Sequence, residues 1–169
     1  MPTTYQKYPI STVILANTVT FFTYALGVAI FLQLRFELAV AFFAYCIWME
    51  IRLLRGSCVN CYYYGSRCAF GKGKICALIF PKRNRANLTT HKFAWKNLIP
   101  DFLVLVLPLL AGIVSLIQHF SVVMLLAMVV ITLLATWGNA MVRGSLACAH
   151  CAQRELGCQA AQFFGVAAK

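Results

Sequence analysis

Four long apolar segments dominate the chain, and nearly all of its charges lie between or beside them. The segments cover about residues 10–34, 36–54, 98–118 and 120–142. Each has roughly the 17–25 residues that a helix needs to cross the hydrocarbon of a bilayer. A membrane-spanning strand would alternate apolar and polar positions over only about 10 residues. The pattern therefore predicts an all-α fold, an integral membrane four-helix bundle.

The connections between these segments predict how the helices pair. Residues 33–37 separate the first two segments and residues 118–120 the last two, whereas residues 55–97 form a long connection. A very short turn makes its two helices antiparallel neighbours. We therefore expect two helical hairpins within a single membrane domain that covers residues 1–169.

The distribution of charge predicts the orientation. The chain is 62% hydrophobic and 11% charged, with a net charge of +11, and Arg35 is the only one of its 15 Lys and Arg outside the face that carries both termini and the long connection. Positive charge is enriched on the cytoplasmic side of membrane proteins. We expect both termini in the cytoplasm of a multi-pass protein, with basic side chains contacting anionic headgroups rather than nucleic acid.

A motif occurs once after each hairpin. Residues 55–61 read R-G-S-C-V-N-C and are followed by Cys68, and residues 143–151 read R-G-S-L-A-C-A-H-C and are followed by Cys158. Both contain R-G-S and then C-x2-C-x6-C. We interpret this as two parallel repeats of a transmembrane hairpin, each followed by a cytoplasmic cysteine-rich motif. The first covers about residues 8–76 and the second about 98–160, with a basic loop at 77–97.

The cysteine spacing predicts a metal site. Seven of the eight cysteines lie on the predicted cytoplasmic face: Cys58, Cys61, Cys68, Cys76, Cys148, Cys151 and Cys158. Paired C-x2-C motifs in a reducing compartment indicate metal binding more than disulfides. One arrangement joins Cys58, Cys61, Cys148 and Cys151 around a shared ion. The other gives each repeat its own site, with Cys76 as the fourth ligand of the first, and His150, His91 or an external ligand in the second.

Two cofactors use this ligand set, and structural zinc fits it better than an iron–sulfur cluster. The four-cysteine cluster motif with its following proline is absent from the sequence. Small apolar packing or lipidation of cysteines near the membrane is the simpler alternative. We favour packing for Cys46, which stands alone in the second apolar segment, and leave Cys76 open between the two interpretations.

No catalytic constellation is recognisable, which favours a function without enzymatic activity. The leading hypothesis is a scaffold or accessory subunit of a membrane complex, with other membrane proteins as partners. The alternatives are an electron-transfer subunit with an iron–sulfur cluster, and a protein that transports or handles a soft metal ion. Residues 71–74 read G-K-G-K, for which an interfacial turn is a better interpretation than a phosphate-binding nest.

Overall fold

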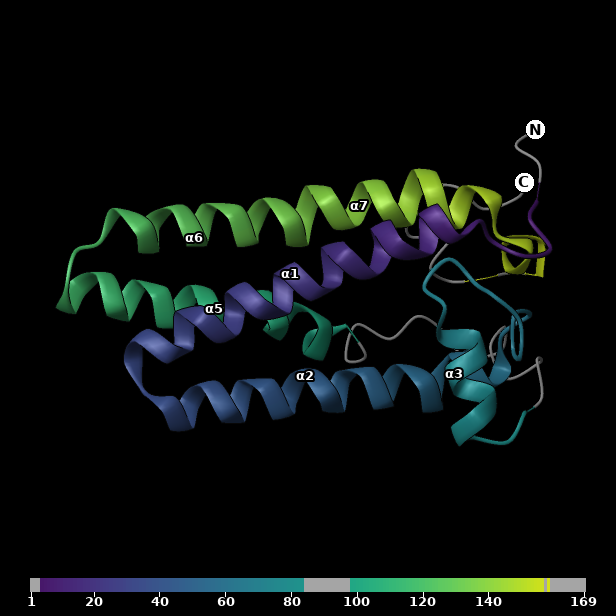
Figure 1. Cartoon of the computed structure of the whole chain (residues 1–169), viewed down its shortest axis with the longest axis horizontal. Coiled ribbons are helices and arrows are strands. Elements are labelled where there is room, and N and C mark those ends of the chain that lie inside the picture. Colours follow the sequence, from purple (N-terminus) through teal and green to yellow (C-terminus); the bar gives the residue numbers. More distant parts are fainter. Residues whose placement is uncertain (1–3, 84–97, 157, 159–169) are drawn as a thin grey trace. The chain divides into compact units, whose positions relative to one another are not determined.

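The computed structural model describes residues 4–83, 98–156 and 158 (Figure 1). These residues belong to two compact units. The first, which we call the thiol unit, draws on Met1–Thr18, Ile51–Phe93 and Asn139–Lys169, and the second, the helical unit, on Val19–Glu50 and Ala94–Gly138. Of the sequence predictions, His91 and most of the basic loop lie outside the described residues, as do both ends of the chain.

The described residues are helical, with no strand among them. The elements are α1 (Ile10–Leu34), α2 (Phe36–Gly56), η1 (Cys58–Asn60), α3 (Lys72–Ile79), α5 (Ile99–Gln118), α6 (Val122–Leu133), η3 (Leu134–Gly138), α7 (Asn139–Met141), η4 (Val142–Ala147), η5 (Cys148–His150) and η6 (Ala152–Leu156). The all-α prediction is confirmed. The first two helices end within two residues of the limits expected from the apolar pattern.

Three helical segments are long and apolar enough to cross a membrane. They are α1, α5 and the run Val122–His150 that begins with α6. These segments indicate a membrane protein. The predicted fourth span, α2, does not belong to this set, because its 21 residues carry Glu37, Glu50, Arg52 and Arg55.

The last helix contains two π-helical turns, η3 and η4, that the apolar pattern did not predict. Side-chain hydroxyl groups donate hydrogen bonds to main-chain carbonyls near both turns. Thr136 Oγ1 donates to the Thr132 carbonyl at 2.6 Å, and Ser145 Oγ donates to the Met141 carbonyl. Such back-bonding competes with the regular α-helical ladder and bends helices. The second turn covers residues 142–147 and so includes Leu146 and Ala147, the two residues by which the second cysteine motif exceeds the first.

Apolar contacts hold the helical unit together. Its core contains Ile30 of α1, Ala111 of α5, and Met124 and Ile131 from α6. A Cβ atom at Gly27 of α1 would come within 2.5 Å of the Phe42 ring of α2. The small residue lets these helices approach closely, as is common in membranes.

Candidate metal centre

The two C-x2-C segments of the thiol unit adopt the same backbone turn. In the first, η1 begins at Cys58 and the Cys61 N–H donates to the Cys58 carbonyl at 3.3 Å. In the second, η5 begins at Cys148 and the Cys151 N–H donates to the Cys148 carbonyl at 3.2 Å. The second cysteine of each pair leaves the turn with an extended backbone. The matching spacing in the sequence therefore corresponds to matching local structure.

The main chain donates to the sulfur of the second cysteine in both turns. The Tyr63 N–H donates to the Cys61 sulfur, and the N–H groups of Gln153 and Arg154 donate to the Cys151 sulfur. Tyr63 and Gln153 occupy the same position, two residues after their cysteine. Hydrogen bonds of this kind favour the charged form of a thiol, which is the form that binds metal.

Two hydrogen bonds join the turns across the sequence. The Tyr62 N–H donates to Gln153 Oε1 at 2.8 Å, and the Ala152 N–H donates to the Tyr63 hydroxyl at 3.1 Å. Gln153 is 2% exposed, so water cannot easily replace it. Each bond lies within two residues of Cys61 on one side and of Cys151 on the other. Residues about 90 positions apart are thereby fixed next to each other.

The segment before α1 is a third part of the site, and the sequence did not identify it. The Tyr5 N–H donates to the His150 carbonyl at 3.0 Å, and the Tyr63 hydroxyl donates to the Tyr5 carbonyl. The Tyr8 hydroxyl donates to the Ala147 carbonyl, just before Cys148. Tyr8 is 1% exposed. A clue was available in the sequence, because these two aromatic residues flank the polar positions 6 and 7 ahead of the first apolar segment.

The thiols divide between two small cores of the thiol unit. Cys61, Cys68 and Cys151 pack against the cluster of Tyr8, Tyr63, Ala69 and Ala147. Cys58 and Cys76 pack instead with Leu54 and Val59. Cys76 is fully buried, and its Sγ donates to the Leu54 carbonyl at 3.6 Å. That contact is consistent with the packing interpretation of Cys76.

Burial raises the pKa of Cys58 and of Cys61, and the proximity of other cysteines adds to this effect. Burial, followed by the neighbouring Cys68, Cys61 and Cys76, raises the pKa of Cys58 to about 12. Burial raises the pKa of Cys61 to about 12, although the Tyr63 N–H opposes the rise, and Cys151 and Cys158 contribute to it. The thiols of both motifs are thus within electrostatic range of each other.

No group of three His, Cys, Asp or Glu side chains among the described residues is arranged to hold one ion in this conformation. The His150 ring stacks on Tyr5 at 4.7 Å between centroids, so it is engaged elsewhere. The donor types nevertheless suit zinc or iron, since half-buried cysteines whose sulfurs accept main-chain hydrogen bonds are the surroundings such metals use. A bound cation would deprotonate these thiols, and the proton would leave to solvent.

The glycines of the G-K-G-K stretch have structural explanations. A Cβ atom at Gly73 would lie 2.2 Å from the Tyr63 carbonyl oxygen and 2.5 Å from that of Ser66. Only glycine allows α3 to lie this close to the loop that follows Cys61. Gly71 has a φ of 68°, a left-handed conformation that glycine adopts without strain. The predicted turn is wrong for residues 72–74, which form the first turn of α3, and both glycines are explained by close packing or backbone conformation.

The helical unit contains the remaining cysteine, Cys46, which is buried in α2. Comparison with known proteins adds no assignment: no family model, curated protein or solved structure matches the chain. The function must therefore be argued from the residues of the thiol unit.

Proposed function

We propose that this is a small polytopic membrane protein whose thiol unit binds a metal ion, most suitably structural zinc, through cysteine thiolates. The observation that carries the proposal is the pair of equivalent C-x2-C turns, each with a main-chain donor to its second sulfur. A packing or lipidation role for the cysteines explains neither the duplicated turn nor the bonds that join the two copies.

Cys61 and Cys151 are the proposed central ligands. They pack on the same core, and hydrogen bonds within two residues of each hold their turns together. Cys58, Cys148, Cys68 and Cys158 supply the further sulfurs, and Cys76 is the least suited because its Sγ already donates to the Leu54 carbonyl.

Such a metal would join the segments of the thiol unit. It would connect the turn after α2 to the turn after η4, which are far apart in the sequence. A closed set of thiolates stabilises a fold and leaves no open position for chemistry. We therefore propose a scaffold or accessory role beside other membrane proteins.

The proposed topology is that of two hairpins. The three ranges of the thiol unit contain the start of α1, the end of α2, and the chain from Asn139 onward, so α1 leaves this unit and α2 returns the chain to it. The charges of α2 lie near its ends, and residues 38–49 are uncharged, which is compatible with a span. Because 13 of the 15 Lys and Arg belong to the thiol unit's ranges, all except Arg35 and Lys96, we propose that this unit faces the cytoplasm.

Elemental analysis of the purified full-length protein, combined with a visible spectrum, tests the metal proposal. We expect a colourless protein with stoichiometric zinc, reduced several-fold in Cys61→Ser and Cys151→Ser. Cys46→Ser is the matched control and should keep the metal. A brown protein with stoichiometric iron would assign an iron–sulfur cluster instead. Metal content that is unchanged in both site variants, or absent from the wild type, would contradict the proposal.

A further inference from the structure

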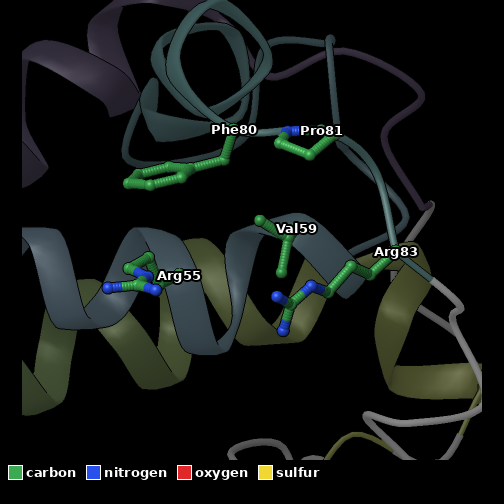
Figure 2. Close-up of a pocket in the computed structure, with 5 residues that line it drawn as sticks. All are labelled: Arg55, Val59, Phe80, Pro81 and Arg83. Atoms are coloured by element: carbon green, nitrogen blue, oxygen red, sulfur yellow. The ribbon is translucent and has the colours of Figure 1, made fainter.

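A small cavity of the thiol unit lies beside the first C-x2-C turn and is separate from the sulfurs. It has a volume of about 220 Å³ and is lined by Arg55, Val59, Phe80, Pro81 and Arg83. Figure 2 shows Phe80 and Pro81 facing Val59 across the cavity, with the two arginine side chains on either side of Val59. The volume is below the roughly 300–1,000 Å³ of typical ligand pockets, so it suits a small chemical group.

The walls of this cavity are held in place by the main chain. The Arg83 N–H donates to the Val59 carbonyl at 3.0 Å, which fixes the segment after α3 against η1. The Tyr64 hydroxyl donates to the Phe80 carbonyl at 2.8 Å. Arg55 extends from the last turn of α2. Two guanidinium groups from distant parts of the sequence therefore border one cavity of defined shape.

The charge of these arginines is not neutralised within the described part of the chain, where neither guanidinium has an ion-pair or hydrogen-bond partner. The ranges of the thiol unit contain a single acidic residue, Glu155, among 13 basic ones. Arginine presents several donors in a planar fork that matches the oxygens of a phosphate. Both side chains are exposed to solvent, and an anion that accepts hydrogen bonds from both guanidinium groups at once, such as a phosphate, suits their placement beside one cavity.

The helix α3, which leads into the cavity, indicates which kind of molecule would carry such a phosphate. Ile75, Leu78 and Ile79 lie at helical spacing along α3 and are exposed, Leu78 by 87%, whereas Gly73 and Cys76 are buried. The chain continues from Ile79 directly into Phe80, which lines the cavity. A short helix with exposed apolar residues beside cations is typical of an element that lies at the membrane surface.

We propose that the cavity between Arg55 and Arg83 binds the phosphate of an anionic membrane lipid. The acyl chains extend along the exposed apolar residues of α3. This inference does not depend on the metal, because neither arginine is a proposed ligand. A soluble phosphate would be recognised by the same two arginines. A lipid differs from it because its acyl chains add to the binding affinity.

Native mass spectrometry of the full-length, delipidated protein in detergent tests the proposal, with dioleoylphosphatidylglycerol and inorganic phosphate as separate probes. We expect the lipid to bind far more tightly than inorganic phosphate. The double variant Arg55→Gln/Arg83→Gln should weaken lipid binding on the order of tenfold to a hundredfold, as expected for lost hydrogen bonds to a charged group. Lys7→Gln, matched to the single variant Arg55→Gln, removes one charge from an exposed position outside both the cavity and α3, and should change binding little.

Three outcomes would overturn the proposal. The arginine double variant could bind the lipid as the wild type does, or the lysine control could lose just as much affinity, which would indicate a general effect of charge. Equal affinity for inorganic phosphate and for the lipid would mean that the cavity binds phosphate but that the acyl chains contribute nothing, so the bound phosphate would not be that of a lipid. An unchanged thermal midpoint in the arginine variant checks that it is folded, as expected for two exposed side chains.

Discussion

The helical unit and the thiol unit are held together by different kinds of contact. In the helical unit, apolar side chains such as Ile30, Ala111 and Ile131 pack between regular helices. In the thiol unit, hydrogen bonds also connect main-chain groups far apart in the sequence, as from the Tyr5 N–H to the His150 carbonyl and from the Tyr8 N–H to the Arg67 carbonyl. The charges follow the same division, since 13 of the 15 Lys and Arg belong to the thiol unit's ranges.

This difference determines how each unit should respond to change. Packed side chains can shift by a few tenths of an ångström, so the helical unit should tolerate small increases in volume. A main-chain oxygen held by the fold cannot shift as easily, and a buried donor without its acceptor has no water to replace it. Small substitutions should therefore be more costly in the thiol unit than in the helical unit.

The largest effect is expected from adding one methyl group at Gly73. In Gly73→Ala the new Cβ would overlap the carbonyl oxygens of Tyr63 and Ser66, which belong to the main chain. We expect a loss of about 3 kcal/mol or more in the free energy of unfolding. In Gly27→Ala the atoms nearest to the new Cβ belong to the side chains of Phe42 and Pro108, and the change should cost about 1 kcal/mol.

The loss of stability in these two variants can be measured by hydrogen exchange of peptides from each unit and by thermal midpoints in detergent. Gly56→Ala is the control, because no atom lies within 4 Å of its Cβ position. It should be neutral or slightly stabilising, since alanine favours a helix more than glycine does. An equal loss for Gly27→Ala and Gly73→Ala would contradict the distinction between the two units.

The next largest effect is the response of the metal-free protein to alkaline pH. Burial raises the pKa of Cys58 and of Cys61 from 9.0 to about 12, so the folded state holds these protons more tightly than the unfolded state does. Their contribution to stability is complete below pH 9 and is lost as the pH rises towards 12. After chelator treatment, hydrogen exchange should increase with pH in the thiol unit more than in the helical unit, beyond the intrinsic increase seen in unfolded peptides. A uniform increase in both units would be evidence against the raised pKa values.

A smaller loss is expected when Gln153 is replaced. Gln153→Leu has a similar volume but leaves the half-buried Tyr62 N–H without its acceptor. The expected cost is about 2 kcal/mol. Gln6→Leu makes the same chemical change at an exposed position and should change the thermal midpoint little. Equal midpoints for the two variants would show that the Tyr62–Gln153 bond does not hold the turns together.

The smallest effect is expected from removing one hydroxyl group. Tyr8→Phe retains the buried ring and loses the hydrogen bond to the Ala147 carbonyl, at a cost of about 1 kcal/mol. Tyr5→Phe keeps the ring that stacks on His150 and serves as the matched control in the same thermal assay. A loss for Tyr5→Phe as large as that for Tyr8→Phe would contradict the assignment, because Tyr5→Phe keeps both the stacked ring and the main-chain hydrogen bonds of residue 5.

Local patterns were sufficient for the helices and for the cysteine turns. The apolar segments predicted α1 and α5 almost to the residue, because helix length and hydrophobicity are set within each segment. The C-x2-C spacing likewise corresponded to the same turn at Cys58 and at Cys148. The four-span bundle, its duplicated hairpins and its orientation stay predictions. The π-helical turns were not predicted, because the sequence does not show to which carbonyl the hydroxyl group of a helical Ser or Thr will donate.

By itself, the sequence determined the helical class, the three segments long and apolar enough to cross a membrane, and the equivalence of the two cysteine turns. All of these arise between residues close in the chain. Only the tertiary structure decided that Tyr5 and Tyr8 bond to the second cysteine turn. It alone showed that α3 packs at Gly73 against main-chain carbonyls, and that Arg55 and Arg83 border one cavity. These contacts connect residues separated by up to 139 positions. The geometry of these contacts depends on the folding of the whole thiol unit, so it cannot be predicted from the hydrophobic periodicity or the cysteine spacing of the sequence.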